Sequence, residues 1–215
     1  AQGMEVVVNT LSDLNKSQGG DGKVDIVAHS LGNLVTRQYL LTHRDNHKIR
    51  RYIAVGAPFK GAWFMSADNN IKSVPLVGSP IESAIANFFL DTYNKGKTIK
   101  VTKDSMASTQ ATPGSEFLDG PNGINKTKIN NLEVYAIYGD VNTTIRQKVF
   151  NKSFERKFNL GDGLILPDSA TYTAWTDFNS RKFAYSGAII LDVKFDRLKG
   201  ALAAEISSND LTAVK

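Results

Sequence analysis

The chain has 215 residues, of which 41% are hydrophobic and 22% charged, and its formal net charge is +5 at pH 7. This composition excludes a largely disordered chain, and no apolar run approaches the roughly 18 residues of a membrane span. The absence of cysteine excludes disulfides and thiolate metal sites. The basic residues are spread out, so we interpret them as a solvated surface, with attraction to anionic lipid surfaces as the alternative. No nucleic-acid-binding module is recognisable and no nucleic-acid partner is expected.

The first predicted elements are a helix, a strand and a second helix. Apolar residues recur at helical spacing over residues 4–14, and the glycine-rich turn at residues 19–22 ends this helix. Residues 24–28 form a short apolar run suited to a buried parallel strand. Residues 33–42 carry apolar side chains on one helical face, which predicts a helix soon after the strand.

Three later segments also favour strands. Residues 51–55 are closed by the sequence GAPFKG, and residues 132–140 read LEVYAIYGD. A basic, irregular segment follows, and residues 182–195, KFAYSGAIILDVKF, supply one or two more strands. This order of elements predicts an α/β fold with a mostly parallel sheet and flanking helices.

Residues 62–131 interrupt the pattern, and we interpret them as an inserted cap. They are mixed in polarity apart from the apolar sequence IESAIANFFL and a proline-glycine turn in TPGSEFL. Residues 73–90 form an apolar lid in one interpretation, while buried packing explains the same residues equally well. The predicted core then comprises residues 1–61 and 132–215.

The sequence DIVAHSLGNL places Ser30 between the predicted strand and the second helix. A tight strand-to-helix turn exposes a serine hydroxyl above the sheet, and it needs small residues two before and two after, here Ala28 and Gly32. The backbone N–H of Leu31 is then placed to stabilise an oxyanion. The pattern predicts that Ser30 is a catalytic nucleophile; the alternative is an ordinary capping serine.

The histidines do not supply an obvious base for this serine. His29 is a neighbour in the turn, and its side chain is expected to leave in a different direction from that of Ser30. His43 and His47 lie about 20 Å from Ser30 at the far end of the following helix, and we expect both at the surface. No residue after His47 is a histidine.

Five segments between residues 24 and 170 carry a resemblance to a known family. They are VDIVAHSLGNLVTRQYL, YIAVGAPFKGA, PGSEFL, YAIYGD and GDGLILPDSA. In this order they resemble the serine lipases and acyltransferases of the α/β-hydrolase superfamily, especially the lecithin:cholesterol acyltransferase-like branch. The resemblance implies a partial α/β-hydrolase fold and a serine-dependent ester hydrolase or acyltransferase acting on lipid-like substrates. It implies no metal or organic cofactor.

The resemblance also implies a catalytic acid. In that branch the acid is the aspartate of a G-D-G-T-V-P-like motif, which maps onto Asp162; the match departs at residues 164–166 but Pro167 is retained. Asp140, immediately after the third predicted strand, is the rival, because many α/β-hydrolases carry the acid at that strand end. We favour Asp162 because its flanking glycines fit the family pattern better. For each aspartate, a turn residue without a catalytic role is the alternative.

In this superfamily a histidine follows the acid, and several strands precede the nucleophile. Here no histidine follows Asp162, and only a helix and a turn precede the strand that leads to Ser30. We therefore expect a hydrolase fragment truncated at both ends, with its histidine beyond Lys215 and little activity alone. The alternative is a catalytically inactive module that binds lipid or a protein partner. The oligomeric state stays open, and an extracellular or membrane-associated location is favoured.

Overall fold

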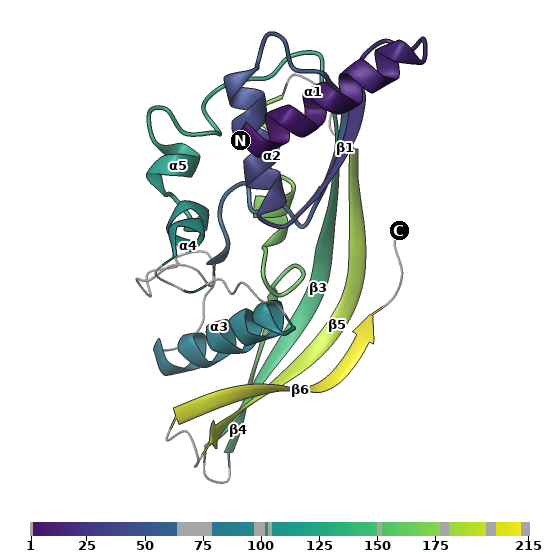
Figure 1. Cartoon of the computed structure of the whole chain (residues 1–215). Helices are drawn as coiled ribbons and strands as arrows, with labels where there is room; N and C mark the ends of the chain where they lie inside the picture. The colour runs from purple at the N-terminus through teal and green to yellow at the C-terminus, as the bar shows by residue number, and fades with distance from the viewer. Residues whose placement is uncertain are drawn as a thin grey trace.

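The computed structural model describes residues 2–63, 79–96, 102, 105–149, 152–176, 181–196 and 201–211. In the amino-terminal part the elements are α1 (Gln2–Ser17), β1 (Val24–His29), α2 (Gly32–Thr42), β2 (Ile49–Val55), α3 (Ser79–Asn94), α4 (Met106–Ala111) and α5 (Glu116–Asp119). They are followed by β3 (Glu133–Val149), β4 (Lys152–Asn159), α6 (Pro167–Ala170), β5 (Arg181–Asp196) and β6 (Ala201–Leu211). Figure 1 shows one sheet with helices packed beside it.

The sheet has six strands in the order β1-β2-β3-β5-β6, and β4 pairs with β3 off this path. The pairs β1-β2, β2-β3 and β3-β5 are parallel, whereas β3-β4 and β5-β6 are antiparallel. The helices α1 and α2 lie beside β1, and α3 lies across β6 at the other end of the sheet (Figure 1). The predicted α/β class, with a mostly parallel sheet and flanking helices, is confirmed.

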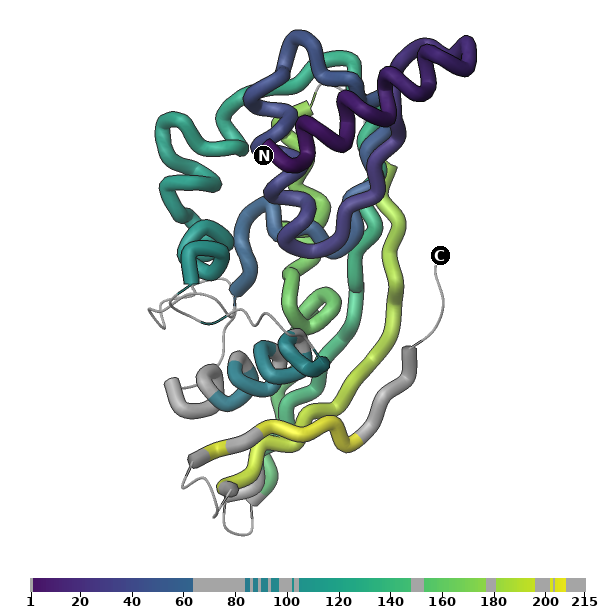
Figure 2. Tube along the Cα trace, viewed as in Figure 1, coloured from purple at the N-terminus to yellow at the C-terminus, as the bar shows by residue number. Residues whose placement is uncertain are grey.

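The strand β3 is much longer than the predicted segment of residues 132–140, whereas β5 covers the predicted segment of residues 182–195 as a single strand. The two strands run side by side over most of their length (Figure 2). Beyond Ile137, where β2 ends, β4 takes over the same edge of β3, from Asn142 to Val149. The prediction of an irregular basic segment after the third strand was therefore wrong. The segment forms the second half of β3, which pairs with β4 and β5, and the strand β4, which pairs with β3.

This extension also corrects the position of Asp140. The residue was expected immediately after a strand, but it lies inside β3 and pairs with Ser186 of β5. The neighbouring strand β2 ends with Val55 opposite Ile137, so Asp140 lies in the part of β3 that extends beyond β2.

Two groups of buried side chains form the core. One lies under α1 and α2 and includes Val8, Tyr39 and Leu40 together with Tyr52 and Trp175. The other is lined by residues of the central loops, α3 and the long strands, with members such as Leu118, Ile124, Leu160 and Leu191. Ser30 belongs to the turn that joins β1 to α2.

The described part of the predicted lid, residues 79–90, belongs to helix α3. Its Ala84 and Ile85 are buried in the same cluster as Leu191 and Val193 of β5. The apolar side of this helix thus packs against the sheet, which is the buried-packing interpretation of its sequence. Residues 73–78 lie outside the described residues, and the cap boundaries at 62 and 131 stay a prediction. Among the described helices, none has the length and apolar content needed to cross a membrane.

Candidate functional site

Ser30 has a backbone φ of +52°, and it is one of two described non-glycine residues with a positive φ, the other being Asn131. It directly follows β1 and precedes the first turn of α2. A non-glycine residue in this left-handed region costs of order 1–2 kcal/mol and persists only where surrounding contacts impose it. The expected place of Ser30 between a strand and a helix is confirmed, and the turn is strained at the serine itself.

A hydrogen-bond network on the buried side chain of Asn33 holds this turn. The Ser30 N–H donates to the carbonyl oxygen of Val55 over 3.0 Å. Asn33 Nδ2 donates to the carbonyl oxygens of Ser30 (2.9 Å) and Val55 (3.1 Å), while its Oδ1 accepts from the Tyr52 hydroxyl (2.8 Å). Sequence reasoning missed Asn33 and Tyr52. A polar residue three positions after the serine, on an otherwise apolar helix face, was the available signal.

Leu31 occupies the N-cap position of α2 with helical backbone angles (φ −58°, ψ −23°) and no side-chain cap. Among the described residues its N–H has no hydrogen-bond acceptor. Unpaired N–H groups at a helix N-terminus favour negative charge. The Leu31 N–H is therefore available to an anionic oxygen bound above Ser30.

Gly32 does not have the strict steric role that the small-residue pattern suggests. A methyl group on Gly32 would lie 3.9 Å from Cβ of Ala28, which is ordinary van der Waals contact. The residue lies in α2, and its φ is not in the positive range that favours glycine. Alanine at this position is thus sterically allowed.

We expect Gly32→Ala to keep the fold and to change the free energy of unfolding by no more than about 1 kcal/mol, with helix propensity favouring alanine. Gly139→Ala is the matched contrast, because its methyl group would lie 2.5 Å from the backbone nitrogen of Asp162. Overpacking of this kind costs about 1–3 kcal/mol. Urea unfolding of both variants measures the difference; equal losses would contradict the steric argument.

An aromatic cluster lies beneath the Ser30 turn. The fully buried Trp175 packs on Phe59 (ring centroids 5.4 Å apart) and on Tyr52 (6.2 Å). The guanidinium of Arg37 stacks on the same indole, 4.0 Å from its ring centroid, and donates to the carbonyl oxygen of Ile124. Burial lowers the pKa of Arg37 to about 10. Contacts in this cluster connect Arg37 of α2, Tyr52 of β2 and Trp175 after α6. They surround the hydrogen bond between Tyr52 and Asn33.

Asp162 lies in the turn after β4, where the backbone holds one of its carboxylate oxygens. Oδ1 accepts from the N–H groups of Leu164 (2.9 Å) and Ile165 (2.7 Å). Oδ2 faces Gly56, where an added methyl group would lie only 2.9 Å away. Gly56, directly after β2, and Gly139, inside β3, therefore leave room for Asp162.

A pocket of about 290 Å³ contains this carboxylate. Its walls include His29, Gly56, Val141, Asp162 and Ser186. Asp162 is exposed as a whole residue, and the atoms packed around its carboxylate bury that group only in part. This burial raises the pKa of Asp162, against the two backbone hydrogen bonds and the attraction of His29, which lower it. A carboxyl group with a raised pKa in a pocket is a candidate functional group.

The raised pKa predicts how Asp162 affects stability. Between the ordinary value of 3.8 and the raised value, the folded protein holds a proton that the unfolded chain has lost. Stability therefore falls as pH rises through this window, and the ionised carboxylate costs stability above it. We expect Asp162→Asn to be more stable than the unchanged chain at neutral pH, with this advantage vanishing below pH 3.8. Urea unfolding at neutral pH and below pH 3.8 measures the difference in stability between the two chains. A difference that is the same at both pH values would contradict the prediction.

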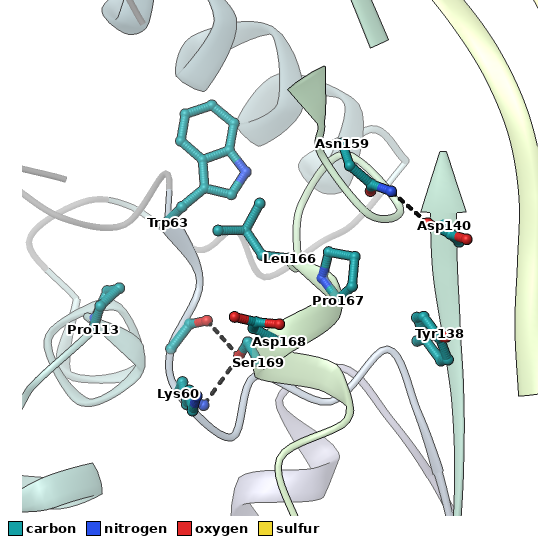
Figure 3. Close-up of a pocket in the computed structure, with 11 residues that line it drawn as sticks. Lys60, Trp63, Pro113, Tyr138, Asp140, Asn159, Leu166, Pro167, Asp168 and Ser169 are labelled. Atoms are coloured by element: carbon teal, nitrogen blue, oxygen red, sulfur yellow. Dashed lines mark hydrogen bonds between the residues drawn. The ribbon is translucent and has the colours of Figure 1, made fainter. Parts of the chain in front are cut away.

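Asp140 lines a different pocket, of about 490 Å³ (Figure 3). Asn159 donates a hydrogen bond to its carboxylate, and Asp168 lines the same pocket. The Ser169 hydroxyl donates to the Gly61 carbonyl oxygen over 2.8 Å and accepts from the Lys60 N–H over 3.0 Å. The two candidate acids are thus separated: Asp162 shares a pocket with the residue before Ser30, and Asp140 does not.

The three histidines have different surroundings. His29 is exposed at the end of β1 and lines the Asp162 pocket. His43 and His47 are partly exposed, and each also contacts a neighbouring group. His43 stacks on Tyr39 and pairs with Glu5 at 3.2 Å, and His47 Nε2 lies 2.9 Å from the Asn130 carbonyl oxygen.

Fold and site together define an α/β protein that holds a serine in a left-handed turn between a parallel strand and a helix. Residues 9–85 match the model of the lecithin:cholesterol acyltransferase family, which confirms the resemblance seen in the sequence. The match includes Ser30 and Leu31 and ends before Asp140 and Asp162. It supports a function of lipid acyltransferase or esterase type. No curated protein matches the chain.

Proposed function

We propose that the chain is a serine-dependent carboxylic ester hydrolase or acyltransferase for lipid-like substrates. Ser30 is the nucleophile, the Leu31 N–H stabilises the oxyanion, and Asp162 orients the base. The observation that carries the proposal is the left-handed backbone of Ser30 between β1 and α2. The strained turn raises the hydroxyl above the sheet, as nucleophilic attack on an acyl carbon requires.

In the reaction, Oγ of Ser30 bonds to the acyl carbon while its proton passes to an imidazole. The alcohol then leaves with that proton, so that an acyl-serine ester remains. Water or an acceptor alcohol next attacks the acyl carbon and gives its proton to the imidazole. The bond between that carbon and Oγ then breaks and Oγ takes up the proton, which releases the acid or a new ester and restores the serine. The position of Asp162 in the pocket beside His29 supports its role over that of Asp140.

The base is the component that these 215 residues do not obviously supply. No histidine follows Asp162, and His43 and His47 are held away from the pocket. In this proposal the base is an imidazole other than those of His29, His43 and His47. Loss of one triad member leaves a residual acceleration of roughly 10³ to 10⁴ over water in the system where this was measured. The chain alone should form an acyl-serine slowly and turn over little.

Burst kinetics test the proposal. The chain is mixed with p-nitrophenyl butyrate and with the laurate ester, and nitrophenolate release is followed. We expect a slow burst approaching one nitrophenolate per chain, followed by a much slower phase, because the acyl-serine has no base for its hydrolysis. Release that stays linear and matches a serine-free control protein would overturn the proposal.

The missing histidine supports a second candidate function, a catalytically inactive module that binds lipid. The net charge of +5 supports attraction to anionic lipid surfaces in either case. Sedimentation with phosphatidylglycerol vesicles, in parallel with the burst assay, separates the candidates. Vesicle binding without a burst favours the inactive module, and a burst favours the enzyme.

A further inference from the structure

The strand β1 lies at one edge of the sheet, and in the described part of the chain it pairs only with β2. We propose that the free side of β1 binds a second copy of the same chain, with the two β1 strands antiparallel about a two-fold axis at Val27. This interface is independent of the proposed function, because it needs neither the Ser30 hydroxyl nor the Asp162 carboxylate.

The backbone of β1 presents free hydrogen-bonding groups along this edge. The N–H groups of Val24 and Ser30 both donate to carbonyl oxygens on the β2 side. Backbone groups point to alternate sides along a strand, so those of Asp25, Val27 and His29 point outward. Among the described residues, none bonds to these outward groups. A row of unpaired groups of this kind is a template for pairing with another chain.

One antiparallel register satisfies these groups and matches acidic with basic side chains. The exposed Val27 meets its own copy at the axis, and Asp25 then lies opposite His29 of the second copy. Each of these pairs exchanges two backbone hydrogen bonds, because both of its residues point outward. A shift by two residues would place Val27 opposite Asp25 or His29, so the acidic and basic side chains would no longer face each other.

The surroundings of Asp25 favour a basic partner. Ion pairs join three carboxylates and two guanidiniums at this end of the strand, those of Asp21, Asp25, Glu133, Arg50 and Arg51. The hydrogen bond from Arg50 lowers the pKa of Asp25, so this carboxylate is ionised at neutral pH. The network thus carries an excess of negative charge. His29 is exposed at the other end of β1, and its imidazole is attracted to this network when the two strands pair.

Helix α1 adds apolar surface beside this edge. Its Val7, Leu11 and Leu14 are exposed, and their i, i+4, i+7 spacing places them on one side of the helix. Glu5 pairs with His43 just after α2. Leu14 follows Glu5 by about two and a half turns, so the apolar side faces away from α2. Because α1 lies beside β1 (Figure 1) and a two-fold axis perpendicular to the sheet keeps both copies of α1 on one face, their apolar sides can meet across the axis.

Analytical ultracentrifugation of the full chain tests the proposal. We expect the mass to rise from the 23.5 kDa of one chain toward twice this value over roughly 1–100 µM, as for a small interface. Val27→Lys should weaken association at least about tenfold, because it places two like charges opposite each other at the axis. Val35→Lys makes the same exchange at an exposed position of α2 and should leave association unchanged.

Single cysteines test the register. The chain has no cysteine of its own, so Val27→Cys supplies one thiol per chain. Facing residues in a hydrogen-bonded antiparallel pair have Cα atoms about 5.5 Å apart, which a disulfide spans. We expect mild oxidation to join Val27→Cys chains much faster than Val35→Cys chains. Asp25→Cys mixed with His29→Cys should also cross-link, whereas neither variant should do so alone.

Each outcome decides the proposal. A mass of one chain at every concentration overturns it, even if another protein binds the β1 edge. Association that survives Val27→Lys, or cross-linking that is equally fast in Val35→Cys, places the contact elsewhere and also overturns it. If circular dichroism shows that Val27→Lys does not fold, the cysteine variants decide. Acylation of Ser30 is measured separately, so failure of this interface leaves the proposed function untouched.

Discussion

Replacing Ser30 with alanine is expected to abolish the acyl adduct formed with p-nitrophenyl butyrate, while slow steady-state cleavage by the chain alone changes little. The adduct needs the Ser30 oxygen, so its loss should be complete. Residual cleavage comes instead from binding and the oxyanion-stabilising N–H of Leu31, which the variant keeps. In triads, removing a second member after the first costs little more, because the members act as a unit.

When imidazole is added as an external base, the same variant should cleave the ester no faster than imidazole does without protein, because a base without a nucleophile restores nothing. Intact mass spectrometry measures the adduct, and Ser17→Ala, which removes an exposed hydroxyl at the end of α1, is the control. Ser30 carries its left-handed strain in either form, so circular dichroism should show an unchanged fold. An adduct that persists in Ser30→Ala would place the reactive group elsewhere.

Replacing Trp175 with alanine is expected to lower the free energy of unfolding by about 3–5 kcal/mol. The indole is 1% exposed, so truncation leaves a cavity between Phe59 and Tyr52. It also removes the ring on which Arg37 stacks, so the buried guanidinium loses a favourable contact and the folded state is destabilised further.

Urea unfolding measures this loss, and Trp175→Phe, which keeps most of the packing, should cost clearly less. The damage should reach the site, because Tyr52 connects the cluster to Asn33 and the Ser30 turn. We therefore expect slower acylation in Trp175→Ala even where the protein remains folded. A loss below 1 kcal/mol would show that the cluster does not hold the fold around the turn.

The Ser30 turn was predictable because its signals are local. An apolar run, a serine flanked by small residues and an amphipathic segment follow one another within residues 24–42, and the structure has β1, the turn and α2 in that order. The hydrogen bond between Asn33 and Tyr52 could not be predicted from local patterns. The two residues are far apart in the chain and meet only when β2 pairs with β1.

The long strands show the opposite case. Residues 141–149 are mostly polar, with apolar residues only at Val141, Ile145 and Val149, and they are extended because β4 and β5 pair on both sides of them. Such tertiary pairing overrides local propensity, and the sequence analysis consequently misplaced Asp140 at a strand end. Asp162 was identified from a family pattern. The space that it occupies depends on the absence of a side chain at Gly56 and Gly139.

The most direct test of the central claim is the site of covalent attachment of a serine-directed fluorophosphonate. The full chain is incubated with the probe, digested, and the modified peptide is sequenced by mass spectrometry. The account predicts one adduct, on Ser30, formed faster with imidazole present and faster in Asp140→Asn than in Asp162→Asn. A chain that stays unmodified with imidazole present, or carries the adduct on another residue, would contradict the assignment of Ser30 as the nucleophile.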